Sequence, residues 1–423
     1  MINLIEKAKS KSLDLEVKKT FNQFLELRIL NDEVKQFESS NITYYDVKAI
    51  INNKCVTISC ENLNNADYII DELEKSSVIL DNDDKDFLAK TNLVYEDRED
   101  LSLNCDEIRK DLLELNDYRN KYKNIFNIDS ILECNYKNVE IINTNDVNLK
   151  DERGFNSIYI SVSLKENEKI SEASDYYLFK KYEKQDMIDF FESLLDDAIK
   201  RLNETSVKSE KYNVIVNNNS MYLILKTFKD MFMAKTINKG VSLLSNSFGK
   251  EIFSPLVNIV EEPESKDYFG RKLFDSEGNK CINKSLIDNG KFVNKLYDNK
   301  EALKENLLST GNADGVSNMY LVPGNSSFKE LVKEMKDGVI ITDLSGMHSG
   351  VNTITGDMSL DAKGYLVENG NITKPLKAIL LSANLFELLN NVECVGSNLE
   401  FYSSICGSPS ILFNDISIAG NIK

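Results

Sequence analysis

The stretch from Leu344 to Leu360 reads LSGMHSGVNTITGDMSL and is the most distinctive part of the sequence. It contains three glycines within eleven residues, at positions 346, 350 and 356. Glycine punctuates turns, so the stretch predicts a loop with tight turns. It also contains His348, the only histidine among the 423 residues.

One histidine restricts the chemistry available to this chain. Most metal-hydrolase sites and many acid–base enzymes use imidazoles. Motifs with two histidines, such as H-E-x-x-H, are impossible here, so a zinc site would need carboxylates and cysteines for nearly every ligand. A P-loop is absent as well, because Gly249-Lys250 is followed by Glu251 instead of a hydroxyl residue. The sequence therefore argues against a conventional metalloenzyme.

Outside this stretch, glycine and proline divide the chain into two parts. All five prolines follow residue 250, and Gly154 is the only glycine before Gly240. We therefore expect an α+β fold with two domains. Residues 1–235 would form an N-terminal α/β domain with helices on a mostly antiparallel sheet, with a subdivision near 100–210 as an open alternative. Residues 236–423 would form a β-rich domain, like a barrel or a sandwich.

The spacing of apolar residues predicts the elements of the first part. Period-3.6 patterns predict helices over residues 5–13, 66–74, 105–122, 186–203 and 220–233. Alternation predicts strands over residues 24–37, 47–51, 55–60, 139–142, 157–164 and 212–216. The acidic run Asp81–Asp84 lacks the glycine and the final glutamate of a calcium loop, so it predicts a solvated loop.

Two passages in the second part resemble each other. Leu286–Leu296 and Leu366–Leu376 both place an apolar pair and an acid before Asn-Gly, followed by a second apolar run. Asn-Gly between such runs predicts a type I′ hairpin. The likeness has two explanations: an internal repeat, or two hairpins that use the same turn.

Composition excludes several classes of protein. The chain has 51 basic and 68 acidic residues, a net charge of −17, which opposes direct binding to nucleic acid or to an anionic membrane. No apolar run reaches the roughly 20 residues of a membrane span, and the N-terminus lacks the apolar core of a signal peptide. Seven cysteines without a C-x-x-C pattern predict reduced thiols. We therefore expect a cytoplasmic protein.

Several motifs together resemble the TldD/TldE family, also called PmbA or modulator of DNA gyrase. The stretch 344–360 resembles the family's G-x-H-S-G-x-N-x-x-T-G-D-F-S. The other matching motifs are Ser242–Gly249, Val257–Pro263, Phe274–Gly278, Ser309–Ala313, Glu368–Gly370, Pro375–Lys377, Ala383-Asn384, Val395–Phe401 and Gly407–Ser410. The match is dense from about residue 240 to 420 and is closest to the TldE branch.

The resemblance implies two kinds of subunit. The TldD type binds zinc through H-E-x-x-x-H on a helix and a distant cysteine, and acts as a metallopeptidase; the TldE type lacks the histidines and pairs with TldD. The zinc helix corresponds to residues 224–233, where Lys226 and Lys229 would repel a cation and Asp230 alone cannot replace two imidazoles. Cys406 falls at the position of the distant cysteine. We expect it to be a buried structural thiol, or at most the remnant of a metal ligand.

The resemblance also selects candidate residues for binding a peptide or a partner subunit. They are His348, Ser349, Gly350, Asn352, Thr355, Gly356, Asp357 and Asn312. For His348 the alternative is a loop histidine that bonds nearby backbone. For Asp357 the alternatives are a helix cap or an Asx bond that fixes the loop, and, less expected, a catalytic carboxylate. For Asn312 the alternative is a structural turn.

These expectations lead to a non-catalytic TldE-like subunit of a cytosolic zinc metallopeptidase that cleaves unfolded or modified peptides. This chain would bind no cofactor itself, and zinc would lie in a TldD-type partner. It would form a heterodimer with that partner or a homodimer, and would hold extended peptides by strand addition to free edges of the β-rich domain. The alternatives are a stand-alone peptide-binding or regulatory protein, and a peptidase that pairs Cys406 with His348.

Overall fold

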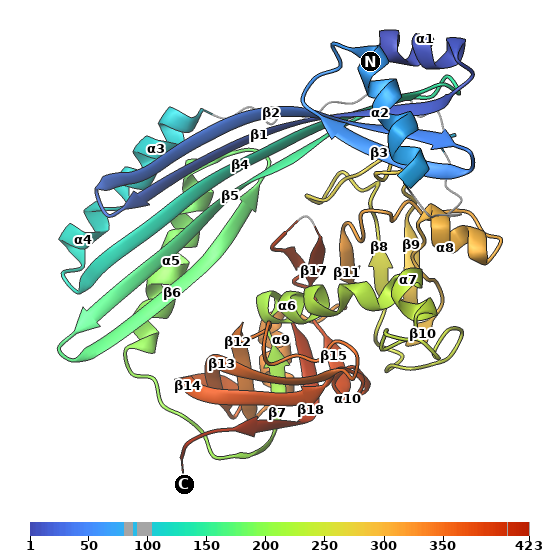
Figure 1. The fold of residues 1–423 in the computed structure, drawn as a ribbon. Coiled ribbons are helices and arrows are strands. Elements are labelled where there is room, and N and C mark those ends of the chain that lie inside the picture. Colours follow the sequence, from blue (N-terminus) through green and yellow to red (C-terminus); the bar gives the residue numbers. More distant parts are fainter. Residues whose placement is uncertain (80–87, 91–103, 404, 423) are drawn as a thin grey trace.

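The computed structural model describes residues 1–79, 88–90, 104–403 and 405–422, and Figure 1 shows how its elements are arranged. The acidic run Asp81–Asp84 lies outside the described residues. The fold is α+β, as expected, with one long sheet built from the first half of the chain and two further sheets built from the second.

The N-terminal sheet is antiparallel, with strand order β3-β2-β1-β4-β5-β6. Its strands are β1 (Asp14–Leu30), β2 (Glu33–Ile51), β3 (Lys54–Cys60), β4 (Ile125–Asn143), β5 (Asn148–Glu166) and β6 (Lys169–Phe179). Four of them have 17 to 19 residues, which gives the long curved ribbon across the top and left of Figure 1. Asn52 and Asn53 form the turn between β2 and β3, and both residues have positive φ.

Helices cover this sheet at its two ends. The end of the sheet where β1 begins carries α1 (Ile2–Ser10) and α2 (Ala66–Ile79), which pack on Leu15, Val17 and Val47. The helices at the other end are α3 (Cys105–Glu114), α4 (Asp117–Lys121) and α5 (Lys184–Arg201). They contribute to a second apolar core, in which Phe191 is fully buried. The long sheet is therefore stabilised by two separate cores rather than one.

Two sequence predictions in this part were wrong in detail. The predicted strand over 24–37 is the end of β1, a turn at Asn31-Asp32 and the start of β2. Asn31 adopts positive φ, and no glycine or proline marks the turn. The alternating pattern therefore continues through the turn without a sequence signal for it. The predicted helix over 105–122 is interrupted at Leu115-Asn116 and forms α3 and α4.

The second sheet forms the expected barrel. Its order is β14-β13-β12-β7-β18-β15, and β14 also pairs with β18, which closes five strands on themselves. The strands are β7 (Glu210–Val216), β12 (Gly338–Ser345), β13 (Asp357–Glu368), β14 (Asn371–Asn384), β15 (Val392–Val395) and β18 (Ile411–Ala419). The domain boundary at 235/236 stays a prediction, but β7, which precedes it, is paired with β12 and β18 of the barrel.

The third sheet has the order β10-β9-β8-β11-β17-β16. Its strands are β8 (Ile259–Glu261), β9 (Lys284–Asp288), β10 (Lys291–Phe292), β11 (Met319–Leu321), β16 (Glu400–Phe401) and β17 (Cys406–Ser408). Helices in this half are α6 (Asn218–Phe228), η1 (Lys229–Phe232), α7 (Ala234–Asn238), α8 (Asn299–Lys304), α9 (Phe328–Met335) and α10 (Leu385–Asn390). Helix α6 packs against both β12 and β17, so the barrel and the third sheet share one apolar core.

Both predicted Asn-Gly hairpins are confirmed. Asn289 and Gly290 have φ of 46° and 76°, and Asn369 and Gly370 have 53° and 71°, which are the signs a type I′ turn requires. A Cβ atom at Gly290 would lie 2.1 Å from the Phe253 carbonyl oxygen, so glycine is also needed there for space. The two hairpins lie in different sheets. Their shared turn conformation accounts for the similarity between the two sequence passages.

Phe274 joins the two halves of the molecule. It is fully buried among Ala89, Val139, Ile141 and Leu149, which belong to the N-terminal half. In Figure 1 the loops of the third sheet lie directly beneath the end of the long sheet. Among the residues described, no helix is long and apolar enough to cross a membrane.

Candidate functional site

Most of the predicted binding residues lie on the loop between β12 and β13. The loop is held by its own backbone: the amides of Ser349 and Gly350 donate to the Gly346 carbonyl at 3.1 and 2.8 Å. The Asn352 side chain accepts from the amides of Ile354 and Thr355 at 3.0 and 3.2 Å, an Asx turn. The loop is thus a preformed structure rather than a tether.

Asp357 fixes the end of this loop. Its carboxylate accepts hydrogen bonds from the Thr355 hydroxyl at 2.7 Å and from the Asn384 amide at 2.9 Å. The bonds from Asn384 and then from Thr355 lower the pKa of Asp357, because they stabilise the charged form. This geometry agrees with the loop-fixing alternative for Asp357. Gly356 beside it is buried with φ of 84°.

His348 and Ser349 are exposed at the tip of the loop. Within the parts of the chain that the structure describes, the His348 imidazole makes no hydrogen bond or ion pair, so the alternative of a histidine bonded to nearby backbone has no bond to support it. The exposed polar groups of the loop, His348, Ser349, Asn352 and Thr355, lie together on one segment. A role for them in binding stays a prediction.

Asn312 lies elsewhere and is buried. Its amide donates to both carboxylate oxygens of Glu261 at 2.8 and 3.0 Å, and its carbonyl accepts from Lys284 at 3.1 Å. Lys284 in turn bonds Glu261 at 2.6 Å, with only 6% and 1% of the two side chains exposed. The structure does not bring Asn312 together with the 346–357 loop. The polar atoms of its side chain form hydrogen bonds within the protein, which agrees with the alternative of a structural turn.

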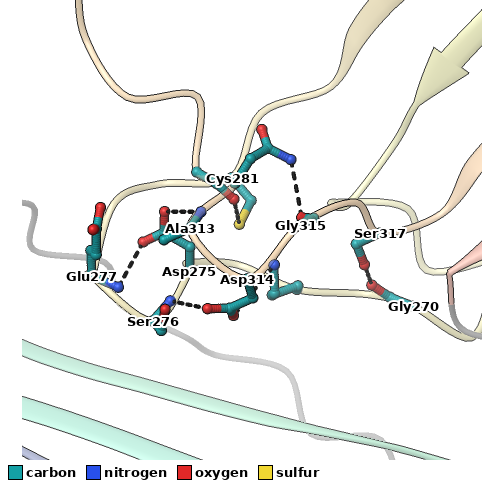
Figure 2. A network of polar contacts seen from close by, with 12 residues as sticks. Gly270, Asp275, Ser276, Glu277, Cys281, Ala313, Asp314, Gly315 and Ser317 are labelled. Atoms are coloured by element: carbon teal, nitrogen blue, oxygen red, sulfur yellow. Dashed lines mark hydrogen bonds and ion pairs between the residues drawn. The ribbon is translucent and has the colours of Figure 1, made fainter. Parts of the chain in front are cut away.

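Further hydrogen bonds link residues 270–281 with residues 311–317, the segment that contains Asn312 (Figure 2). The Asp275 carboxylate accepts from the amides of Glu277 and Ala313, both at 3.0 Å. The Asp314 carboxylate accepts from the Ser276 amide at 2.9 Å. The motifs Phe274–Gly278 and Ser309–Ala313 are therefore joined through Asp275 and Ala313, which gives both motifs a structural role.

The position of the expected zinc helix is occupied by α6 and η1. Asn217 caps α6 by accepting from the Ser220 amide at 2.9 Å, and the apolar face of the helix is buried. Lys226 bonds the Tyr222 hydroxyl at 3.0 Å, and Lys229 pairs with Asp230 at 2.8 Å. Two ammonium groups oppose a cation here, and the described residues contain no group of three His, Cys, Asp or Glu that could hold a metal ion. These side chains do not fit a zinc site.

Cys406 lies on β17, which packs against α6. The thiol is fully buried, and this burial raises its pKa well above the usual value. Among the described residues its sulfur has no hydrogen-bond partner, so it is not bonded to the exposed His348. A buried protonated thiol is a poor nucleophile, which argues against a Cys–His peptidase. None of the seven cysteines forms a disulfide.

A cavity of about 610 Å³ lies between the long sheet and the third sheet. Its walls come from β1, β4 and β5 on one side, and from residues 269–272 and 314–317 and Ile405 on the other. Sequence reasoning missed this cavity, because its residues come from six separate segments of the chain. The one available signal was the clustering of basic residues at Arg271-Lys272 within an acidic chain.

Free strand edges lie mainly in the N-terminal sheet. The closed barrel hides most of its edges, and the outer strands β10 and β16 have only two residues each. By contrast, β3 covers the outer edge of β2 only from Tyr45 onward, and among described residues no strand pairs with Glu33–Tyr44 on that side. Barrel closure leaves the β-rich domain with only short free edges, and strand addition to that domain stays a prediction.

Asp175 on β6 contacts α6 across the boundary between the two halves. It accepts from the Asn219 side chain at 3.1 Å and from the Tyr176 amide at 2.7 Å. Burial, together with the nearby charge of Glu400, raises the pKa of Asp175 to about 7. The folded protein therefore holds a proton on Asp175 between about pH 4 and 7 that the unfolded chain releases, and this contribution to stability is lost as the pH rises through 7.

Replacing Asp175 by asparagine is expected to stabilise the protein at pH 8. Asparagine resembles the protonated carboxyl and keeps both acceptor bonds, so we expect a gain of about 1–2 kcal/mol at pH 8 and almost none at pH 4. Thermal melts followed by circular dichroism at both pH values measure this. A variant that is equally stabilised at both would contradict the assigned titration.

Comparisons with known proteins match most of the chain after residue 98. A family model described as the PmbA/TldA metallopeptidase C-terminal domain matches residues 209–420, and one for the central domain matches residues 98–206. "Metalloprotease PmbA" of Escherichia coli is 32% identical over 224 residues, which are 53% of this chain and 49% of that protein. The Buchnera aphidicola homologue is 31% identical over 225 residues, 53% and 50% of the two chains. This chain thus spans about half the length of these relatives.

Two crystal structures share the whole fold. A candidate modulator of a DNA gyrase from Thermotoga maritima superimposes with a TM-score of 0.92 at 24% identity, over 99% of both chains. TldE from Thermococcus kodakarensis superimposes with a TM-score of 0.87 at 18% identity, over 99% of this chain and 100% of that one. At these identities the likeness establishes the fold.

Proposed function

Because this chain belongs to the PmbA/TldD family of metallopeptidase-related proteins, we propose that it is a non-catalytic, TldE-like subunit of a two-chain zinc peptidase. Zinc and the hydrolytic step would belong to a TldD-type partner chain. This chain would close the chamber around an unfolded or modified peptide, and the complex would work in the cytoplasm. The alternative is a stand-alone peptide-binding or regulatory protein that supports no proteolysis.

The residues at the family's zinc position support the non-catalytic role. Lys226 and Lys229 lie on the stretch 224–233, which corresponds by its place in the chain to the zinc helix of the TldD type. Cys406 is buried against α6, and the described residues hold no group of three metal-ligating side chains. A zinc ion there would meet two ammonium groups and one protonated thiol, whereas catalytic zinc takes three protein ligands. The residues present therefore support a role that leaves zinc binding to another chain.

Two features support a role in holding peptides. The outer edge of β2 from Glu33 to Tyr44 presents backbone groups that an extended peptide can pair with. The 610 Å³ cavity beside the long sheet has the size of a site for a few side chains. The exposed loop with His348 provides a third surface, on which a partner subunit could rest.

The test is reconstitution with a TldD-type chain. We expect the purified chain to contain no stoichiometric zinc by elemental analysis and to leave an unfolded casein-like substrate intact. Cleavage should begin when the TldD-type chain is added, and should stop with a chelator. Stoichiometric zinc with chelator-sensitive cleavage by this chain alone would contradict the proposal. Peptide binding without cleavage in the mixture would favour the stand-alone alternative.

Substituting Cys406 tests the remaining catalytic reading. We expect Cys406→Ala to keep the cleavage rate of the reconstituted complex within about twofold, because the thiol is buried and bonds no reacting group. His348→Ala serves as a matched variant on the exposed loop. A loss of cleavage of about a hundredfold or more in both variants, with complex formation intact, would instead indicate a Cys–His mechanism.

A further inference from the structure

We propose that the cavity between the long sheet and the third sheet binds a carboxylate group of a peptide. The expected group is the C-terminal carboxylate of that peptide. This inference rests on the proposed function, since it presumes that the chain handles peptides. It adds to that function the chemical class of ligand that the cavity binds, a carboxylate. Nothing in the family likeness assigns a ligand to this cavity.

The cavity is basic although the protein is acidic. Of the described residues that line it, four are cationic, Lys137, Arg153, Arg271 and Lys272, and one is a carboxylate, Asp314. Asp314 pairs with Lys272 at 3.5 Å, and Lys272 has only 5% of its side chain exposed. Because the whole chain carries −17, a positive cavity of this kind is not a consequence of overall composition. It focuses an attractive field on a small anion.

Two of the cations keep capacity for a ligand. Among the described residues, the buried Nε atom of Arg153 has no hydrogen-bond partner, and a carboxylate oxygen of Asp151 lies 3.8 Å from it. Among the residues that the structure describes, Lys137 makes neither a hydrogen bond nor an ion pair. Half-burial and the nearby charges of Arg153 and Lys18 lower the pKa of Lys137. A partly buried cation without a partner is unfavourable, and an anion in the cavity would relieve this cost.

The remaining lining favours the end of a peptide over a free inorganic anion. Aromatic side chains stand beside the cations: Phe24, Tyr136, Phe155 and Phe269. Such a mixture accepts an apolar side chain next to a charged group, as at a peptide terminus. A planar carboxylate also matches the fork of an arginine guanidinium. A nucleic acid backbone is disfavoured, because the chain as a whole carries a net charge of −17 and would repel its other phosphates.

The strand β17 places this cavity close to the family's cysteine position. Ile405 lines the cavity, and its carbonyl accepts from the Met319 amide at 2.9 Å, which ties β17 to β11. Cys406 follows directly and turns into the core beneath α6. A peptide terminus held in the cavity would therefore lie on the sheet-facing side of β17, opposite α6.

The test compares three synthetic peptides with the full-length chain alone. The first is a fluorescein-labelled apolar hexapeptide with a free C-terminus, the second is its C-terminal amide, and the third is the amide with one internal glutamate. We expect fluorescence anisotropy to show at least tenfold tighter binding of the free acid than of the amide. Tight binding of the glutamate peptide would show that the site also accepts a side-chain carboxylate, which supports the same site. Equal binding of acid and amide would overturn the proposal.

Charge variants locate the site. Lys137→Gln with Arg153→Gln should weaken binding of the free acid at least tenfold, whereas Lys165→Gln, an exposed lysine on β5 with Arg153, should change it less than twofold. Lys137→Gln alone removes a cation without a described partner and should fold normally, so it remains informative if the double variant does not. Unchanged binding in these variants, or competition by inorganic phosphate at lower concentration than by acetate, would refute a carboxylate site here.

The two proposals fail in distinguishable ways. Binding of the acid peptide is measured without any partner chain, so it does not depend on zinc or cleavage. If reconstitution with a TldD-type chain yields cleavage but acid and amide peptides bind alike, the carboxylate site is wrong and the subunit role stands. If the acid peptide binds selectively but no partner supports cleavage, the subunit role is wrong and the cavity keeps its assignment.

Discussion

Replacing Lys284 by alanine is expected to lower the free energy of unfolding by about 3–5 kcal/mol, because it leaves the buried carboxylate of Glu261 without its counter-charge. The two side chains are almost fully buried and their charged atoms lie 2.6 Å apart. Asn312 and the Ser317 amide would still donate to Glu261, but neither carries a charge. Chemical denaturation followed by circular dichroism measures the loss.

An exposed ion pair provides the control for this variant. Lys200 pairs with Asp196 one helical turn away on α5, with more than half of each side chain exposed. Lys200→Ala should therefore cost less than about 1 kcal/mol. The double variant Lys284→Met with Glu261→Gln should recover much of the loss, because it removes both charges together. If Lys284→Ala costs no more than Lys200→Ala, the buried pair is not the stabilising contact inferred here.

Replacing Phe274 by alanine is expected to cost about 3–5 kcal/mol, the usual range for emptying a fully buried phenylalanine site. Its ring contributes the contact by which the second half of the chain is anchored on the long sheet. We expect the two halves to unfold less cooperatively in this variant, because the anchor links them. Denaturation monitored by circular dichroism, together with limited proteolysis of the loops near residue 274, would show both effects.

Phe37 provides the matched control, because it is the same residue type but 61% exposed on the β1–β2 hairpin. Phe37→Ala should change stability by no more than about 0.5 kcal/mol. A loss for Phe274→Ala as small as that for Phe37→Ala would mean that the two halves do not depend on this contact. A normal denaturation midpoint with increased proteolysis would place the effect on docking alone.

The sequence was most informative where a local pattern determines the structure. Both Asn-Gly turns and the helix over Asp186–Asn203, observed as α5, followed from two residues or from one repeating pattern. The long strands β4 and β5 were each recognised only as short pieces, because polar residues such as those around Asn135 interrupt the alternation over the cavity. Barrel closure between β14 and β18 depends on distant segments and left no local trace.

The candidate site shows the same division. The exposed loop with His348 could be selected from its glycines and its family likeness, because all its residues lie within one stretch. Asn312 was selected with these residues only because it lies in a family motif. Its side chain instead bonds the buried pair of Glu261 and Lys284, which lie on β8 and β9. The basic cavity could not be found, since Lys137 and Arg153 of the long sheet meet Arg271-Lys272 only when the two halves pack together.

The position of β7 in the barrel has a consequence for biosynthesis. Its residues Val214, Ile215 and Val216 are fully buried between β12 and β18, yet β18 spans Ile411–Ala419. As the ribosome makes the chain, the hairpins of the long sheet can pair early, because most of their contacts are close in sequence. The apolar strand β7 emerges next and has no partner until β12 and β18 have been synthesised. Between the emergence of β7 and that of β18, the nascent chain therefore carries an apolar strand whose barrel partners are incomplete, which favours misassembly.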